Sequence, residues 1–298
     1  MPFTHILGQE TALATLTVAL RRGRVHHAYR FEGPDGVGKE LAAMALAQAL
    51  VCTAGDPLGC GRCDACRRAV TFSEERPHAP LHPDVTIVER GFYPQEIVGK
   101  PERTEISVEQ VRTIVLAHAA YPPHEGRARV YIVRRAEELS TGAANALLKT
   151  LEEPRQGTHF ILLTARGDRL LNTIRSRTLP VRFAPLSDAI LRSILRARGT
   201  PDERHDLAIE LAAGSASAAL ELADAERTRA RDAFVDEALA AALARAARGE
   251  AEDSPRAAVL SARRYEAVAR AAVNLDRNAS PQLTLITLIQ AMREVSRA

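Results

Sequence analysis

Short apolar runs and amphipathic stretches alternate along the first 185 residues. Five runs have the length and pattern of buried strands, at residues 28–32, 84–89, 130–133, 160–164 and 178–183. Stretches with apolar positions at helical spacing lie between and around them, at residues 9–22, 41–51, 107–119 and 140–153. Strands separated by helices predict a mostly parallel sheet with helices on both faces.

Local sequence signals indicate where some of these elements begin and end, and which face of a strand is apolar. Ser107 is placed to cap the third helix, and Gln110 three residues later predicts a capping box. Pro154 ends the fourth helix. The last strand alternates like a half-buried strand, with three apolar side chains on one face: Leu179, Val181 and Phe183.

The chain changes character after Pro185, because no further strand pattern follows. Two helical stripes predict a small helical unit over residues 185–223. Residues 224–298 are alanine-rich and helix-forming. We therefore expect an α/β domain over residues 1–184 followed by two helical units.

The composition is that of a globular protein rather than a disordered one. Of 298 residues, 46% are hydrophobic and 26% are charged, which is enough to bury a core. The formal net charge of +3 is too small to indicate nucleic-acid binding by itself. The first ten residues lack a signal-peptide pattern, and no run of apolar residues is long enough to span a membrane. We expect a cytoplasmic protein.

All four cysteines of the chain fall within residues 52–66, at Cys52, Cys60, Cys63 and Cys66. The spacing C-x7-C-x2-C-x2-C provides four thiolates in short turns, which is typical of tetrahedral zinc sites. An all-thiolate set leaves no position for water, so it predicts a structural zinc module. An iron–sulfur cluster and four free thiols remain the alternatives.

A glycine-rich segment follows the first predicted strand and matches the phosphate-binding pattern G-x-x-x-x-G-K. It places Gly33, Gly36, Gly38 and Lys39 between a strand and a helix. In that context, backbone N–H groups, the helix N-terminus and the lysine can hold nucleotide phosphates. The alternative is a glycine-rich turn with a surface lysine.

The residues expected to hold magnesium are replaced by residues of the wrong kind. P-loop ATPases place Ser or Thr after the lysine and an acidic residue at the end of a later apolar strand. Here these positions hold Glu40 and Arg134, with Arg135 next. Glu137 and Glu138 follow in the predicted loop, too far on to substitute. Bound ATP with magnesium is therefore doubtful at this loop, and we expect no hydrolysis.

The chain resembles the AAA+ clamp-loader subunits of bacterial DNA polymerase III over residues 3 to about 186. The resemblance rests on five segments in this order: GPDGVGKE, the cysteine insertion, AANALLKTLEEP, FILLT and TIRSRTLPVRF. It implies an α/β P-loop AAA+ domain with a zinc-module insertion, a helical lid domain over residues 185–223 and an all-helical collar domain over residues 224–298. In that family the gamma/tau motor keeps an intact magnesium site, whereas the delta-prime subunit often has a degraded one. Glu40, Arg134 and Arg135 place this chain with delta-prime.

The same resemblance implies a role for one arginine. The family's Ser-Arg-Cys motif presents an arginine finger to ATP on the neighbouring subunit, and the matching segment here is Ser176-Arg177-Thr178. Thr164 falls where the family's first sensor residue lies, although here it is expected only to cap its strand. The second sensor is usually an arginine near Gly214, where this chain has none.

The resemblance thus implies a non-hydrolysing clamp-loader subunit that joins gamma/tau motor and delta clamp-opening subunits. Together they would load the sliding clamp on primed DNA, and the polymerase activity of the holoenzyme would lie elsewhere. One alternative is an active ATPase motor that uses Glu40 or Glu137 for magnesium. Another is a zinc-knuckle DNA-binding protein, which Arg67 and Arg68 beside Cys66 would suit.

Overall fold

The computed structural model describes residues 2–99, 104–125 and 127–224. These residues divide between two compact units. The first runs to Ile194 and takes in the segment Ala213–Ser217, and the second contains Leu195–Ala212 and, among the described residues, 218–224. The first unit holds all the strands that the structure describes, so we call it the α/β unit and the second the helical unit.

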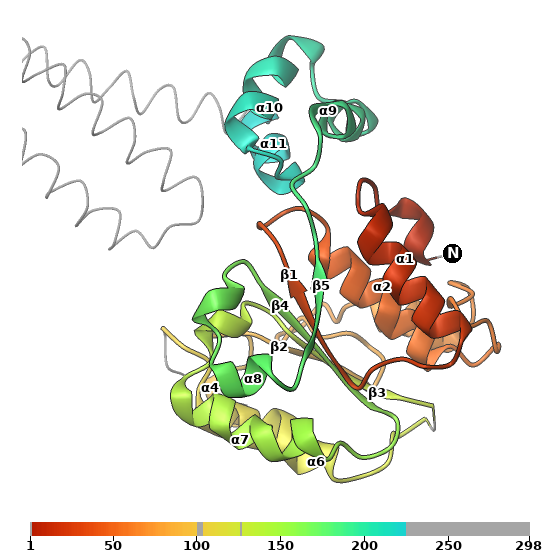
Figure 1. Cartoon of the computed structure of the whole chain (residues 1–298), viewed down its shortest axis with the longest axis vertical. Helices are drawn as coiled ribbons and strands as arrows, with labels where there is room; N and C mark the ends of the chain where they lie inside the picture. Colours follow the sequence, from red (N-terminus) through yellow and green to blue (C-terminus); the bar gives the residue numbers. More distant parts are fainter. Residues whose placement is uncertain (1, 100–103, 126, 225–298) are drawn as a thin grey trace, which may run out of the picture. The chain divides into compact units, whose positions relative to one another are not determined.

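A five-stranded sheet forms the centre of the α/β unit (Figure 1). Its strands are β1 (Ala28–Glu32), β2 (Val85–Val88), β3 (Arg129–Val133), β4 (Thr158–Thr164) and β5 (Leu179–Arg182). They lie in the order β2-β3-β4-β1-β5, and every pair is parallel. The predicted parallel sheet is confirmed, and the five predicted strands are its five members.

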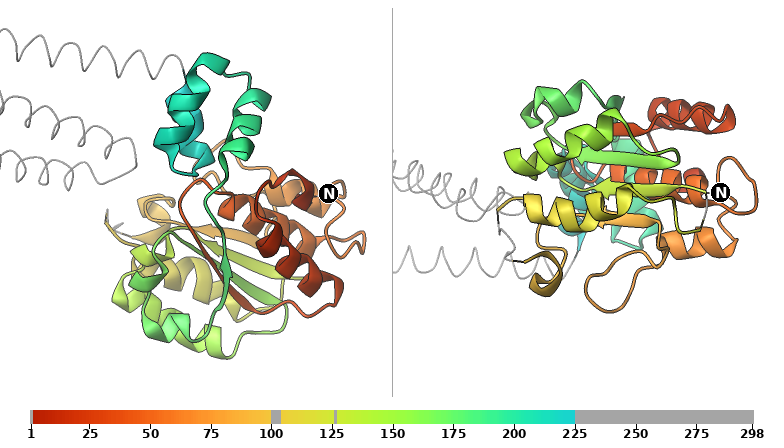
Figure 2. Two further views of the ribbon diagram at one scale, coloured as in Figure 1. Left: turned by 45° about the horizontal axis from the view of Figure 1, so that its top comes forward. Right: turned by 90° about the horizontal axis from the view of Figure 1, so that it is seen from below.

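Helices cover both faces of this sheet (Figures 1 and 2). One face carries α1 (Glu10–Arg21), α2 (Lys39–Val51) and α3 (Asp64–Val70). The other carries α4 (Gln95–Val98), α5 (Val108–Gln110), η2 (Val111–Leu116), α6 (Ala117–Ala119), α7 (Thr141–Glu152) and α8 (Asn172–Arg175). Short helical turns complete the unit at η1 (Pro2–His5), η3 (Ala136–Glu138) and η4 (Gly167–Arg169).

The sheet is buried on both faces because successive side chains of a strand point in opposite directions. In β4, Ile161 and Leu163 pack beneath α1, α2 and α3, whereas Phe160 and Leu162 pack beneath the helices of the other face. Apolar side chains are therefore needed at consecutive positions. This requirement explains why β2, β3 and β4 appear in the sequence as short apolar runs, whereas the edge strand β5 alternates.

The structure differs from the local predictions in three places. Ser107 does cap the helix, since its hydroxyl accepts a hydrogen bond from the N–H of Gln110. The side chain of Gln110 does not complete a capping box, because it donates to the carbonyl of Glu89 at 2.8 Å. The predicted helix also passes through a π-helical turn, η2. Leu179 was expected to face the core, but it is 42% exposed because β5 is an edge strand.

The helical region after the sheet contains α9 (Asp188–Ala197), η5 (Asp202–Arg204), α10 (His205–Ala212) and α11 (Ala216–Ala223). Within the helical unit, the buried ring of His205 holds the turn before α10, since its Nε2 lies 3.0 Å from the carbonyl oxygen of Thr200. The predicted collar domain lies outside the described residues, apart from its first residue.

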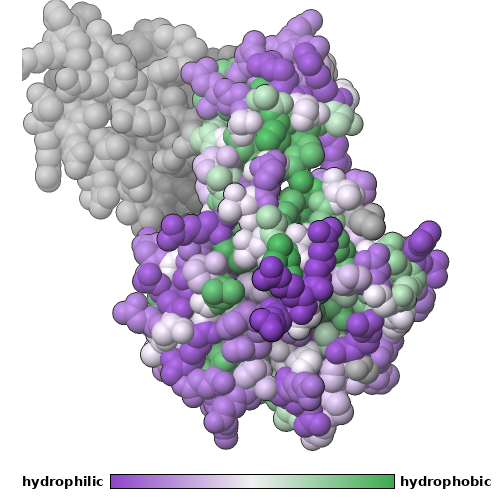
Figure 3. Space-filling model, turned by 45° about the vertical axis from the view of Figure 1, so that its right-hand side comes forward, coloured by the Kyte–Doolittle hydropathy of each residue, from purple (hydrophilic) through white to green (hydrophobic). Residues whose placement is uncertain are grey.

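Polar side chains cover most of the α/β unit on the face that Figure 3 shows, and apolar side chains form small patches among them. Among the described residues, no helix is both long and apolar enough to cross a lipid bilayer.

Candidate functional site: a closed phosphate loop, an arginine and four thiols

The phosphate loop joins β1 to α2 and is covered by another part of its own unit. Gly36 has φ +73°, and its carbonyl accepts a hydrogen bond from the N–H of Ala216 at 3.0 Å. A Cβ at Gly36 would overlap the hydroxyls of Ser215 and Ser217. Gly36 is therefore required by the fold, because any side chain at this position would overlap the segment that packs against the loop.

Lys39, the phosphate-binding lysine of the pattern, is turned back onto the loop. Its Nζ donates to the carbonyls of Gly33 at 2.5 Å and Pro34 at 2.6 Å, and lies 3.5 Å from Oδ1 of Asp35. The residue is only 7% exposed, and this burial lowers the pKa of its ammonium group, against the opposing effect of Asp35. The lysine thus satisfies loop carbonyls where a nucleotide would place phosphate oxygens.

Glu40 and Arg134 form an ion pair with each other, which the sequence did not indicate. Arg134 donates through Nη2 to Glu40, at the start of α2, and through Nη1 to Glu89, just beyond β2, at 2.8 Å. Its guanidinium also lies over the ring of Phe92. The positions of Glu40 and Arg134 are the two at which a P-loop ATPase holds Mg²⁺. The position that the pattern assigns to a magnesium-binding carboxylate therefore holds a guanidinium, which bonds to two carboxylates.

The neighbouring charged residues are also engaged. Glu137 accepts a hydrogen bond from the N–H of Ala165, and Glu138 pairs with Arg135 and with Arg90. Thr164 ends β4, and its hydroxyl accepts from the N–H of Arg166 at 3.0 Å. This contact caps the turn after the strand, as expected for Thr164.

Gln9 ties the phosphate loop to the end of the sheet, and sequence analysis did not find it. Its side-chain amide donates to the carbonyls of Val37 at 3.1 Å and Ala184 at 2.8 Å, and its Oε1 accepts from the N–H of Ala184. The residue is 4% exposed. A polar residue at the edge of a predicted helix resembles an ordinary surface position, so no local signal could have indicated this contact.

Arg177 lies just beyond α8, in a loop that is held by hydrogen bonds from the sheet. Buried Arg30 of β1 donates through Nη1 to the carbonyl of Arg175 at 3.0 Å and to the hydroxyl of Thr178 at 2.8 Å. Thr178 in turn donates to the carbonyl of Ile174. The residue that departs from the Ser-Arg-Cys motif therefore provides a hydroxyl that fixes the loop.

The side chain of Arg177 points away from this support and contacts α7. It donates through Nε and Nη2 to Glu152, and through Nη1 to the carbonyl of Thr173 at 2.8 Å and the hydroxyl of Ser176 at 3.1 Å. The Arg177 and Glu152 side chains are 31% and 47% exposed. Arg177 is thus partly accessible to solvent and does not belong to the core.

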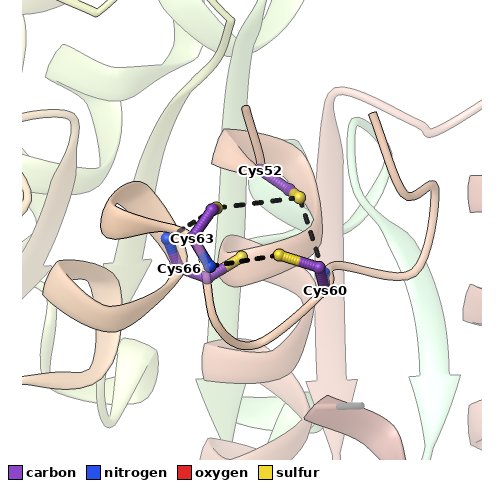
Figure 4. Close-up of side chains that lie close together, drawn as sticks. All are labelled: Cys52, Cys60, Cys63 and Cys66. Carbon is purple, nitrogen blue, oxygen red and sulfur yellow. Dashed lines mark hydrogen bonds between the residues drawn. The ribbon is translucent and has the colours of Figure 1, made fainter. Parts of the chain in front are cut away.

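The four cysteines converge on one point, as predicted from their spacing (Figure 4). All four Sγ atoms lie within 4.8 Å of one another. Four thiols gathered this closely are consistent with a structural zinc site, in which a single tetrahedral ion is bound at about 2.3 Å from each sulfur. Backbone N–H groups donate to three of the sulfurs: Cys60 to Cys52, Cys63 to Cys60, and Cys66 to Cys63.

The surroundings also suit a bound cation. Burial raises the pKa of the Cys63 thiol, but the N–H of Cys66 and the side chain of Thr53 outweigh it and lower that pKa to about 5. For Cys66, burial raises the pKa well above its usual range. A divalent metal is the group that would hold all four as thiolates.

Two side chains fasten this module to the rest of the unit. Gln48 of α2 donates to the carbonyl of Cys66 at 2.8 Å, and Arg127 donates to the carbonyl of Cys52. The nearby arginines are engaged as well. Arg68 pairs with Asp64 and with Glu125 at 2.7 Å. Its guanidinium is therefore already partly neutralised, which weakens its case as a DNA contact.

Comparison with known proteins decides the family. Residues 8–187, which include the phosphate loop, the cysteine module and Arg177, match the family described as DNA polymerase III, delta subunit. The chain belongs to this family. The match covers the whole of the five-stranded sheet and the helices that flank it.

Individual members of the DNA polymerase III group resemble the chain to similar degrees. The gamma/tau subunit of Mycobacterium tuberculosis is 36% identical over 65% of this chain and 30% of its own length. The delta-prime subunit of Bacillus subtilis is 32% identical over 60% of this chain and 48% of its own length. The chain thus spans less than half the length of each of these two relatives.

Among solved structures, a DNA polymerase III gamma subunit-related protein from Thermotoga maritima is 17% identical. The alignment covers 95% of this chain and 99% of that one, with a TM-score of 0.43. This likeness carries no inference about function.

Proposed function

We propose that the chain is a non-hydrolysing, delta-prime-like subunit of the DNA polymerase III clamp loader. In this role residues 1–184 are an AAA+ domain, residues 185–223 are its lid and residues 224–298 its collar. The subunit would work in the cytoplasm with gamma/tau motor and delta subunits, and the assembly would place the sliding clamp on primed DNA. Structural zinc at Cys52, Cys60, Cys63 and Cys66 would stabilise the module without taking part in chemistry.

The observation that carries this proposal is the ion pair between Arg134 and Glu40. An ATPase needs a divalent cation between these positions to neutralise the phosphates and orient them. Here the guanidinium is bound to Glu40 and Glu89, and Lys39 is bound to its own loop. Binding Mg²⁺ and ATP would require all of these contacts to break and a carboxylate to lie beside the phosphates.

Arg177 supports the second half of the proposal. It is partly exposed, and its loop is fixed from the core by Arg30 and Thr178. A planar guanidinium on a rigid support is suited to reach phosphate oxygens on an adjoining subunit. The chain would then take part in ATP hydrolysis only by lending Arg177 to a neighbour.

The proposal is tested by ATP turnover of a complex reconstituted from this chain and motor, delta and clamp proteins. Arg177→Ala should lower turnover at the one adjoining site by about 10³-fold or more, by analogy with fingers supplied in trans to GTPases. Arg175→Ala, which removes an exposed arginine at the end of α8, two residues before Arg177, is the matched control and should change little. Equal turnover by the Arg177→Ala variant and the wild type would exclude the finger role.

The higher identity to gamma/tau relatives favours a second candidate, an active ATPase motor. The two are separated by the purified chain alone. We expect no Mg²⁺-dependent phosphate release from ATP. Turnover that Lys39→Ala abolishes would instead establish the motor.

A further inference from the structure

The two edges of the Arg177 guanidinium have different partners. The Nη1 side bonds to Thr173 and Ser176, which belong to the same loop and helix end. The Nε and Nη2 side bonds to one carboxylate oxygen of Glu152, the last residue of α7. This second edge is the fork with which arginine makes bidentate contacts to carboxylates and phosphates. Glu152 therefore occupies the edge that a phosphate would need.

The contact with Glu152 is easy to break. Both side chains are substantially exposed, at 31% and 47%. Exposed ion pairs of this kind shift an equilibrium by only about 1.4- to 5-fold. The bonds from Arg30 to the carbonyl of Arg175 and to the hydroxyl of Thr178 do not involve the Arg177 side chain, so only that side chain has to move.

We propose that Glu152 is a positioning residue that holds Arg177 in a resting position until a phosphate oxyanion on a neighbouring subunit displaces it. The carboxylate resembles the phosphate in that it is an anion whose oxygen accepts hydrogen bonds from the Nε and Nη2 groups of Arg177. It keeps the guanidinium ordered and solvated in the free subunit and competes weakly with the nucleotide in the assembled one. This inference rests on the proposed function of Arg177. It adds that Glu152 competes with the phosphate for the Nε and Nη2 groups of Arg177.

The first experiment needs no partner. In the full chain labelled with ¹⁵N-arginine, the Nε–H of Arg177 should exchange with solvent about 2- to 5-fold faster in Glu152→Gln than in the wild type. Glu153→Gln removes the same charge one residue further on and should leave the exchange rate unchanged. Equal rates in the Glu152→Gln and Glu153→Gln variants would show that the resting contact does not form, and would overturn the inference.

The second experiment measures ATP turnover by the reconstituted complex. Glu152→Gln should raise kcat/KM for ATP by about 2- to 5-fold, since the fork of Arg177 no longer has to be released. In an Arg177→Ala background the same change should have no effect, because its target is gone. Glu153→Gln is again the control.

The outcomes separate the two ideas. If Arg177→Ala leaves turnover unchanged, the proposed function fails. If Arg177→Ala lowers turnover but Glu152→Gln behaves like Glu153→Gln or lowers it, the finger stands and the competing role of Glu152 is wrong. A rise in kcat/KM that persists in the Arg177→Ala background would also overturn it, because Glu152 would then act through another group.

Discussion

Glu40 and Arg134 illustrate what a single residue can and cannot reveal. Taken separately, each is a residue of the wrong charge at a magnesium position, and the sequence showed this. Their pairing could not be derived locally, because 94 residues separate them. The sequence did contain one signal for the pair. In P-loop ATPases both positions bind the same Mg²⁺, and here they carry side chains of opposite charge, Glu40 and Arg134. Such exchanges can stabilise one another when the ion is absent.

This pairing predicts a gain of function. The double variant Glu40→Thr with Arg134→Asp supplies the hydroxyl and carboxylate of a magnesium site and removes the carboxylate beside the phosphates. Relief of that repulsion should tighten Mg²⁺-dependent binding of ATP by on the order of 100-fold or more. Fluorescence of a labelled ATP analogue, with Mg²⁺ or with EDTA, measures it.

Glu40→Thr with Arg135→Asp is the control for this gain of function, because Arg135 pairs with Glu138 instead. Binding by the unaltered chain as tight as that of the double variant would contradict the account of the closed site.

At the scale of elements, the sequence predicted best where a structure depends on short-range periodicity or spacing. The strands and the cysteine module belong to this class, since the cysteines are held by tight turns within residues 52–66. Contacts between distant elements were missed. Gln110 follows Ser107 as a capping box requires, yet its side chain bonds to Glu89 after another strand. A tertiary partner therefore overrode a correct local signal.

The cysteine module should depend on its metal while the sheet does not. We expect one zinc per chain by elemental analysis, and a binding free energy on the order of 10 kcal/mol, as in zinc-finger peptides. Chelation, or Cys60→Ser, should remove hydrogen-exchange protection from α3 and residues 52–66. Protection in β1 and β4 should persist, since no cysteine lies in the sheet. A purified chain without metal that keeps full protection in α3 would contradict this.

Over the whole α/β unit, a buried charge cluster joins parts that are far apart in the sequence. Asp84 is 1% exposed and accepts hydrogen bonds from the N–H groups of His124 and Glu125 and from the guanidinium of Arg129. Glu125 in turn pairs with Arg68 of α3. The beginnings of β2 and β3 are thus linked to the cysteine module. The sequence shows that these positions are charged, but it does not show which of them form pairs.

This cluster predicts a pH dependence of stability. Burial raises the pKa of Asp84, but the N–H groups of Glu125 and His124 and the Arg129 guanidinium outweigh it and lower that pKa below its ordinary value. The unfolded chain therefore takes up the proton at a higher pH than the folded one. The contribution of Asp84 is complete above the unfolded pKa of about 4 and is lost as pH falls through its folded pKa.

Asp84→Asn should lower the free energy of unfolding at pH 7 by about 3 kcal/mol, because it leaves Arg129 without its charged partner. Urea denaturation at pH 7 and at pH 3, with exposed Asp168→Asn as control, measures this. The difference in the free energy of unfolding between the Asp84→Asn and Asp168→Asn variants should be smaller at pH 3 than at pH 7. A difference that is the same at both pH values would show that the ionised carboxylate is not the stabilising group.

The carboxamide of Gln9 has a mechanical consequence. Its hydrogen bonds to Val37 and to Ala184 connect three segments: the start of α1, the turn before α2 and the residues that follow β5. Glutamate could not replace it, because two carbonyl oxygens would then face a carboxylate with no hydrogen to offer. A displacement of Ala184 would therefore be felt at the start of α1 through these hydrogen bonds.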